Sequence, residues 1–416
     1  MRAPDVRPTS DRPARNEAPL DILYTALCYP PRIGGGEIHL HRVARELVTM
    51  EQRVRVVNQW SRWRRDWLWG STIFTDPAKS YVHEGVPVSQ LGFPVSARLR
   101  MLPWVVAYYG AYHLLMRKSV RHIARSMGPF YEQAAGQPDV IHGVRMGREF
   151  LVQAALSRSR KLDVPFVLTP LHHPRWRGPL YRVYDEIYRQ ADAVIALTDE
   201  ERQMLITEKG IDPSAVHVTG IGPILSDDYS VESFRAEHDL EGPFVLFLGR
   251  HVRHKGYEAI LKAAPRVWRD FPELQFVFVG AHTSHSEAVF AGCEDARVRH
   301  LGTVDLSTKT AALAACEFLC LPSTQESFGG VYTEAWVFGK PVIGGDIPPI
   351  ACVIDDGENG LLSSQEAGEL SEKMLYLLEH PARAKEMGES GKRKVERCYT
   401  WEQIARRTLE VYRSVL

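Results

Sequence analysis

Short runs of β-branched and aromatic residues alternate with helix-like stretches along almost the whole chain, and this alternation restricts the possible folds more than any other feature. The first two runs are Asp21–Tyr29 and Arg53–Trp60. Between them, from about Glu37, apolar residues recur every three or four positions, as on one face of a helix. Such alternation is typical of parallel βαβ units, whose sheets carry helices on both faces. We therefore predict an α/β fold with doubly wound sheets.

The alternation is interrupted once, by a polar segment between Gly222 and Gly242 that is bounded by Pro and Gly and has no strand-like run. It resumes at Phe244–Gly249. We therefore predict two Rossmann-like domains that face each other across a cleft, because ligands of such sheets bind beyond the carboxyl ends of the strands. The predicted segments are an N-terminal domain at 20–222, a linker at 223–242 and a C-terminal domain at 243–398.

Composition excludes several classes of protein. The 416 residues carry a formal net charge of zero, so no general attraction to nucleic acid is expected. No run of about 18 apolar residues is present, which predicts no membrane-spanning helix. Residues 1–19, rich in Pro and Arg, lack the apolar core of a secretory signal and are predicted to be a disordered leader. The six cysteines form no Cys-x-x-Cys pair, which indicates buried thiols in a reducing, cytoplasmic environment.

The segment Thr324–Pro341 carries two glutamates, Glu326 and Glu334, on either side of the pair Gly329–Gly330. It follows a strand-like run, and a helix is expected to begin at the glycines and to end near Gly339. Free N–H groups at a helix start bind anions, and each carboxylate can accept hydrogen bonds from two hydroxyl groups. The arrangement suits two polyols joined by phosphate. The alternative is a solvated loop glutamate with a helix-capping one.

Three further segments follow strand-like runs. Arg250 and Lys255 lie in a basic loop after the first strand of the second half, where they suit a diphosphate; the alternative is a solvated loop. Gly34, Gly35 and Gly36 lead into the first helix without the spacing of a dinucleotide fingerprint. His172 and His173 end another strand of the first half, where one of them would orient a sugar or move a proton, or only pack the loop. No third ligand at regular spacing supports a metal site there.

These segments together resemble the retaining GT-B glycosyltransferases of family 4, the glycosyl transferases group 1. The likeness runs from about Leu20 to Leu416 and is carried by ESFGGVYTEAWVFGKPVIG, by the GR…KG loop at 249–256 and by the Gly-Gly-Glu helix start at 35–37. ADAVIALTDEER and DGENGLL add to it. The resemblance implies that the last helix, 399–416, returns to pack on the first domain.

The resemblance also implies roles for individual residues. Arg250 and Lys255 would hold the donor diphosphate in place of a metal, and Glu334 would bind the ribose hydroxyls. Glu326 would bind the transferred sugar, and either His172 or His173 would contact it; His173 better matches a family variant that ends in His-Pro. The remaining implied donor contacts come from Gly249 and the segment after Glu326, and the glycine loop would approach phosphate or acceptor: Gly249, Ser327, Phe328, Gly329, Gly330, Val331, Gly34, Gly35 and Gly36.

The resemblance therefore implies a retaining glycosyltransferase that needs no metal and no cofactor. It would move a sugar from a nucleotide-sugar donor to a saccharide or lipid-linked acceptor in polysaccharide or glycoconjugate biosynthesis. A nucleotide-sugar epimerase or hydrolase and a non-catalytic nucleotide-sugar-binding protein are the alternatives. The aromatic and basic loop Gln59–Gly70 and the segment Leu99–Met127 are candidates for peripheral contact with the inner face of a membrane; acceptor binding and core packing are the alternative for them. The nucleotide, the sugar and the acceptor are not specified by the sequence.

Overall fold

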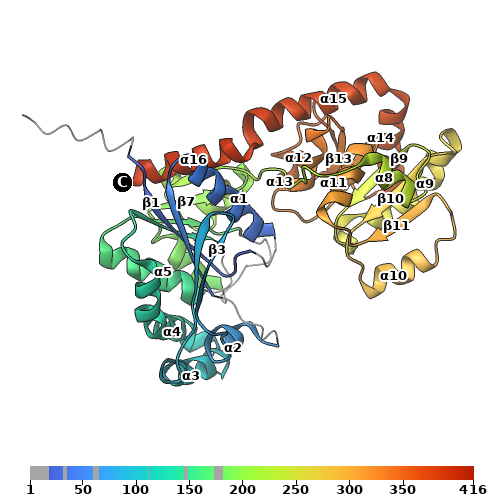
Figure 1. Ribbon diagram of the computed structural model, residues 1–416. Helices are drawn as coiled ribbons and strands as arrows, with labels where there is room; N and C mark the ends of the chain where they lie inside the picture. Colours follow the sequence, from blue (N-terminus) through green and yellow to red (C-terminus); the bar gives the residue numbers. More distant parts are fainter. Residues whose placement is uncertain (1–17, 31–34, 60–64, 111, 145–148, 173–180) are drawn as a thin grey trace, which may run out of the picture. The chain divides into compact units, whose positions relative to one another are not determined.

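The computed structural model describes residues 18–30, 35–59, 65–110, 112–144, 149–172 and 181–416. Most of the predicted leader, residues 1–17, lies outside this part of the chain. The chain divides into two compact units (Figure 1). The first consists of the described parts of Met1–Pro170 and Arg177–Val194 with Thr408–Leu416; the second consists of the described parts of Leu171–Trp176 with Ile195–Arg407.

An eight-stranded sheet has the order β3-β4-β2-β1-β5-β6-β7-β8. Strand β1 pairs in parallel with β2 and β5, and only the outer hairpin of β3 and β4 is antiparallel among the registers that the structure defines. Its strands are β1 (Asp21–Ala26), β2 (Arg53–Asn58), β3 (Lys79–His83), β4 (Val86–Gln90), β5 (Val140–Val144), β6 (Phe166–Thr169), β7 (Ala193–Ala196) and β8 (Val216–Val218). The accompanying helices are α1 (Gly35–Thr49), α2 (Trp67–Thr72), α3 (Val95–Gly110), α4 (Tyr112–Ala135), α5 (Glu149–Leu162), α6 (Arg182–Tyr188) and α7 (Asp199–Thr207).

A six-stranded sheet has the order β11-β10-β9-β12-β13-β14, and all its pairs are parallel. Its strands are β9 (Phe244–Leu248), β10 (Gln275–Val279), β11 (Val298–Gly302), β12 (Phe318–Leu321), β13 (Val342–Gly345) and β14 (Leu361–Ser363). Its helices are α8 (Val231–Glu237), α9 (Tyr257–Asp270), α10 (Ser284–Ala291), α11 (Leu306–Ala315), α12 (Gly330–Val337), α13 (Pro348–Ala351), α14 (Ala367–Glu379) and α15 (Pro381–Lys394). Because the chain leaves β9 toward β10 and later returns to β12 on the other side, the strand order reverses between β9 and β12. This is where open α/β sheets bind ligands.

The final helix is α16 (Trp401–Val415), and its part from Thr408 onward belongs to the first unit. Its Tyr412 is fully buried and donates a 2.7 Å hydrogen bond to the Tyr24 hydroxyl of β1. The Tyr412 hydroxyl also lies 2.7 Å from Nδ1 of His142 in β5, and Nε2 of His142 contacts the Thr169 hydroxyl in β6. A chain of polar groups therefore ties the helix to three neighbouring strands. Because these groups are buried, each one depends on its partner.

The predicted α/β fold is confirmed, and the details differ at several places. The predicted strands Asp21–Tyr29 and Arg53–Trp60 end early, at Ala26 and Asn58. The predicted linker contains α8, which is capped by the Ser230 side chain. The hairpin strand β3 was not predicted, because its mostly exposed and polar residues give no strong alternation. All six thiols are free; Cys28, Cys316 and Cys320 are buried and the other three are half-buried. Within the described residues, no helix is both long and apolar enough to cross a bilayer.

Candidate functional site

Two loops leave the six-stranded sheet side by side, at the point where the strand order reverses. One follows β9 and includes a single helical turn at Arg253–Lys255; the other joins β12 to α12. The backbone oxygen of His254 in the first loop accepts a 2.8 Å hydrogen bond from the Thr324 N–H of the second. It also accepts a 3.1 Å bond from the Gln365 side chain. The two loops are therefore held together as one surface beyond the carboxyl ends of the strands.

Glycine is required at the start of α12. Gly329 caps the helix with φ +78°, in the left-handed region, and a Cβ there would lie 2.3 Å from the Tyr332 ring. At Gly330 a Cβ would meet nothing closer than 3.9 Å, so the backbone there is open to an approaching group. The helix ends as predicted, with Gly339 at φ +63°. The first N–H groups of α12 have no partner inside the helix, which favours an anion or a hydroxyl oxygen nearby.

Lys255 and Glu326 form an ion pair between the two loops. Nζ of Lys255 donates to Oε1 of Glu326, and the two side chains are 19% and 14% exposed. Arg250 lies five residues before Lys255 in the same loop, and it is exposed. In the part of the chain that the structure describes, its guanidinium has no ion-pair partner. The two loops therefore carry one cation that is paired with an acid, Lys255, and one that is exposed to solvent, Arg250.

Glu334 lies deeper, on α12, and is only 4% exposed. Its Oε1 accepts a 2.8 Å bond from Nζ of Lys309 and a 3.3 Å bond from the Ile224 N–H. Lys309 also donates a 2.7 Å bond to the Ile224 carbonyl. Burial raises the pKa of Glu334, and Lys309 opposes this effect. Its Oε2 is buried and has no hydrogen-bond partner within the described residues, so it can accept a hydrogen bond from a ligand hydroxyl.

Lys309 was not predicted as a site residue; it lies 25 residues before Glu334. It is the only charged residue in the helix α11, LSTKTAALAA. A single lysine in a helix of otherwise small, uncharged residues and leucines is a signal that this lysine has an acidic partner. Its acceptor could not be identified from local spacing, because it lies on another helix.

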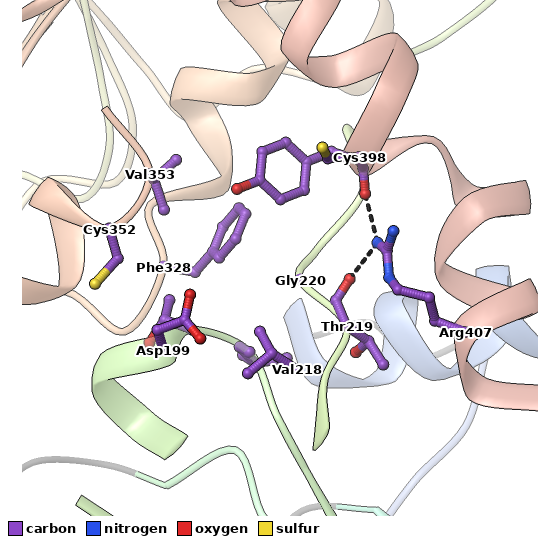
Figure 2. A pocket seen from close by; sticks show the side chains of 12 residues that line it. Asp199, Val218, Thr219, Gly220, Phe328, Cys352, Val353, Cys398 and Arg407 are labelled. Carbon is purple, nitrogen blue, oxygen red and sulfur yellow. Dashed lines mark hydrogen bonds between the residues drawn. The ribbon is translucent and has the colours of Figure 1, made fainter. Parts of the chain in front are cut away.

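The remaining predicted donor contacts lie around Glu326. Ser327 and Val331 are half-buried, and Gly249 follows β9 directly, with its N–H bonded to Val279. Phe328 is buried, with its ring centroid 5.3 Å from that of Tyr399 in an edge-to-face arrangement. It lines a cavity of about 190 Å³, shown in Figure 2, on whose other side Arg407 donates to the carbonyls of Thr219 and Cys398. This volume is too small for a nucleotide sugar, since ligand pockets hold about 300–1,000 Å³.

The predicted residues of the first half are only partly described. His173 and Gly34 lie outside the described residues, whereas Gly35 and Gly36 begin α1. The backbone N–H of His172 donates a 2.9 Å bond to Oε1 of Glu201, and the other oxygen of Glu201 accepts a 2.7 Å bond from the Leu197 N–H. Burial raises the pKa of Glu201 to about 7, although both N–H groups lower it. Glu201 therefore joins the loops after β6 and β7.

Comparisons with known proteins cover both halves of the chain. The family described as "Glycosyl transferases group 1" matches residues 229–394, and "Glycosyl transferase 4-like domain" matches residues 34–222. A phosphatidyl-myo-inositol mannosyltransferase of Mycobacterium tuberculosis is 33% identical over 182 residues, which is 42% of this chain and 48% of that protein. The matched part therefore spans about half the length of that relative. An alpha-maltose-1-phosphate synthase of Mycolicibacterium smegmatis is 32% identical over 54% of this chain and 64% of that protein.

Solved structures show likeness over almost the whole chain. Sucrose-phosphate synthase of Thermosynechococcus elongatus has a TM-score of 0.70 at 19% identity, covering 95% of this chain and 98% of that one. The Anabaena protein HepE, in complex with UDP and glucose, has a TM-score of 0.68 at 17% identity, with 95% and 100% covered. At these identities the likeness establishes the shared two-domain α/β fold.

Proposed function

Because the chain belongs to the group 1 glycosyl transferases, a family with the GT-B fold, we propose that it moves a sugar from a nucleotide-diphosphate donor to an acceptor hydroxyl. The observation that carries the proposal is the pair of joined loops beyond β9 and β12. They present Arg250, Lys255 and Glu326 at one surface, and Glu334 with an unpartnered buried oxygen lies on the adjoining helix. Such a donor needs two cations for its diphosphate. It also needs two acids, one for the ribose and one for the transferred sugar.

The cations serve the leaving group. As the bond between the anomeric carbon and the phosphate oxygen breaks, negative charge grows on the diphosphate. Lys255 and Arg250 stabilise it as fixed charges, which takes the place of a bound metal ion. The acceptor hydroxyl attacks the same face that the leaving group vacates, so that the configuration is retained, and its proton passes to the departing phosphate. A dry site strengthens each of these interactions.

The acids position the two rings. Oε2 of Glu334 accepts a hydrogen bond from a ribose hydroxyl, and Glu326 accepts bonds from hydroxyls of the transferred sugar. Lys255 then exchanges its contact with Glu326 for the donor diphosphate, which frees the carboxylate for the sugar. His173 or His172 approaches the sugar from the loop after β6, and Gly34–Gly36 approach phosphate or acceptor.

The test starts with thermal shifts for UDP, GDP, ADP and dTDP and for their sugars. A ligand at about 100 times its dissociation constant adds about 2.7 kcal/mol to the unfolding free energy. With the donor so identified, Lys255→Ala and Glu326→Ala are expected to abolish transfer without unfolding the protein. Lys262→Ala and Glu287→Ala, at exposed positions of the same unit, are the matched controls. Near-normal turnover in either active-site variant would remove that residue from the mechanism.

The same assay distinguishes the alternative functions. An epimerase or hydrolase converts the donor when no acceptor is added, whereas a transferase at full rate needs the acceptor. A binding protein shows the thermal shift without any turnover. Conversion that is independent of acceptor, or binding alone with every acceptor class tested, would therefore replace the proposed reaction.

A lipid-linked acceptor is supported by the surface of α3 and α4. Leu114 is 85% exposed and Leu99 is 60% exposed, beside the exposed basic residues Arg100 and Lys118. Other large apolar residues exposed on α3 are Val95, Val106 and Tyr109. Such a surface suits peripheral contact with anionic lipid. Leu99→Glu with Leu114→Glu is expected to lower cosedimentation with anionic vesicles; equal binding by the variant would refute the contact. In the predicted aromatic loop, Trp67 stacks on Phe150. Trp60 and Trp63 lie outside the described residues.

A further inference from the structure

Two histidines and a glutamate from separate elements of the first unit meet at one point. His41 lies on α1, and His83 and Glu84 lie at the turn between β3 and β4. The ligand atoms of the three side chains lie within 4.8 Å of one another. Nε2 of His41 is 3.3 Å from Oε2 of Glu84, and Nε2 of His83 is 3.9 Å from Oε1 of the same carboxylate. Two imidazole nitrogens and one carboxylate therefore converge.

The orientation of His41 is fixed by its other ring nitrogen. Nδ1 of His41 lies 2.8 Å from the hydroxyl of Tyr29, in the segment that follows β1. His41 is 7% exposed, and the Tyr29 ring packs edge-on against both histidines, with centroid distances of 5.3 and 6.3 Å. A metal-binding histidine is commonly held in this way, with the second nitrogen in a hydrogen bond that sets ring orientation and tautomer. Nε2 is thereby directed toward the turn.

The turn between β3 and β4 places a glutamate, Glu84, in a backbone conformation that glutamate rarely adopts. Glu84 and Gly85 have φ values of +44° and +83°, as in the two-residue hairpin turn that prefers Asn-Gly or Asp-Gly. A glutamate in this conformation is uncommon, and such residues gather at functional positions. Its longer side chain reaches back to α1, where Arg45 contacts Oε2 at 2.6 Å. The choice of Glu is therefore explained by what its carboxylate contacts and not by the turn.

We propose that His41, His83 and Glu84 bind a divalent transition-metal ion of the Zn²⁺ type, which fastens the β3–β4 hairpin to α1. Three ligands of this kind with an open fourth position match the donor set of many zinc sites. A tetrahedral ion with bonds of about 2.0–2.2 Å brings ligand atoms to about 3.4 Å from one another. The His41–Glu84 distance of 3.3 Å already meets this spacing. All three ligand atoms lie within 4.8 Å of one another, so a shift of about 1.4 Å or less brings His83 into the same coordination sphere.

Arg45 is the competitor that the site must displace. Its guanidinium shares Oε2 of Glu84, and its side chain is 46% exposed, so it can move to solvent when an ion binds. The proposal therefore predicts that Arg45→Gln binds the metal more tightly than the wild type. An ordinary surface ion-pair cluster predicts no metal binding in either protein. The site lies apart from the donor loops in the chain, and the sugar transfer proposed above does not depend on it.

The test uses the full chain, without an affinity tag, dialysed against a chelator and then titrated with Zn²⁺ or Co²⁺. Binding is measured by calorimetry, by bound metal per chain and by the visible absorption of tetrahedral Co²⁺. The wild type is expected to bind one ion with nitrogen and oxygen ligands. His83→Asn and Glu84→Gln are expected to lose this ion. Tyr29→Phe keeps it about tenfold more weakly, because the hydrogen bond that positions His41 is gone.

His285→Asn is the matched control, since His285 forms a His–Glu contact with Glu258 at 2.9 Å but is no part of the three-residue cluster. It is expected to bind the ion as the wild type does. The proposal is overturned if the wild type binds no ion, or if His83→Asn and Glu84→Gln retain the full stoichiometry and Co²⁺ spectrum. Circular dichroism of each metal-free variant checks that the fold is intact. Because the readout is binding, a failed transfer assay leaves this result unaffected.

Discussion

Replacing Glu334 with Gln converts one oxygen of a buried carboxylate into an NH₂ group. Lys309 and the Ile224 N–H occupy Oε1, at 2.8 and 3.3 Å, so the amide oxygen is expected to remain there. The NH₂ group then takes the place of Oε2, the atom without a partner in the described residues. An NH₂ group cannot accept a hydrogen bond from a ribose hydroxyl. The variant therefore removes one proposed contact to the donor and leaves the shape of the site almost unchanged.

The size of the effect follows from the kind of bond that is lost. A hydrogen bond to a charged group contributes about 1.5–3 kcal/mol, which corresponds to a dissociation constant about 10- to 150-fold higher. The metal-free, ligand-free protein is also expected to lose about 1–3 kcal/mol of unfolding free energy, because Lys309 loses its charged partner. It keeps the Ile224 carbonyl at 2.7 Å, which limits this loss. Affinity and stability are therefore measured separately, by calorimetry and by urea unfolding.

A thermodynamic cycle separates the ribose contact from an indirect effect. Wild type and Glu334→Gln are each titrated with the preferred nucleoside diphosphate and with its 2′-deoxy and 3′-deoxy forms. One deoxy form is expected to bind the wild type about 10- to 150-fold more weakly and to bind the variant no more weakly than the parent nucleotide does. Glu326→Gln is the control; it is expected to bind the diphosphate at least as tightly as wild type, because Lys255 loses a competing partner. A variant that still discriminates ribose from both deoxy forms would refute the assignment of Glu334.

Three further predictions concern stability and are measured by urea unfolding. Gly329→Ala is expected to lower the unfolding free energy by about 1–3 kcal/mol because of its left-handed φ of +78°, and Gly330→Ala by less; equal losses would contradict this. Tyr412→Phe is expected to cost about 1–3 kcal/mol, because buried His142 loses a hydrogen bond of 2.7 Å, and an unchanged midpoint would contradict it. Glu201 has a pKa of about 7 in the folded state, against an ordinary 4.5. Between these two pH values the folded protein therefore keeps a proton on Glu201 that the unfolded chain has released. The contribution of Glu201 to stability is therefore greatest below about pH 4.5 and falls by about 3 kcal/mol as the pH rises to about 7. Glu201→Gln is expected to remove this fall. If the unfolding free energy of the variant depends on pH as that of the wild type does, the pKa shift is disproved.

Much of the fold could be predicted because the signals are local. Alternating strand and helix periods, the polar break before Phe244 and the glycines around Gly329 each act within a few residues of the chain. The start and the end of α12 were predicted from its flanking glycines, and both were correct. Strand β3 was missed because an exposed edge strand does not need a buried face, and the helix inside the linker was missed because its seven residues are mostly polar.

The sequence by itself determined that the chain forms two α/β halves and which loops follow the strands, because backbone geometry and burial patterns are set over short distances. Only the tertiary structure decided which side chains meet. It joins Lys309 to Glu334 across 25 residues, His41 to Glu84 across 43 and His142 to Tyr412 across 270. Such pairs depend on how the helices and strands pack against each other. The periodicity of apolar residues within one helix or strand does not reveal that packing. The same reason explains why the lysine partner of Glu334 and the His41–His83–Glu84 cluster came from the structure alone.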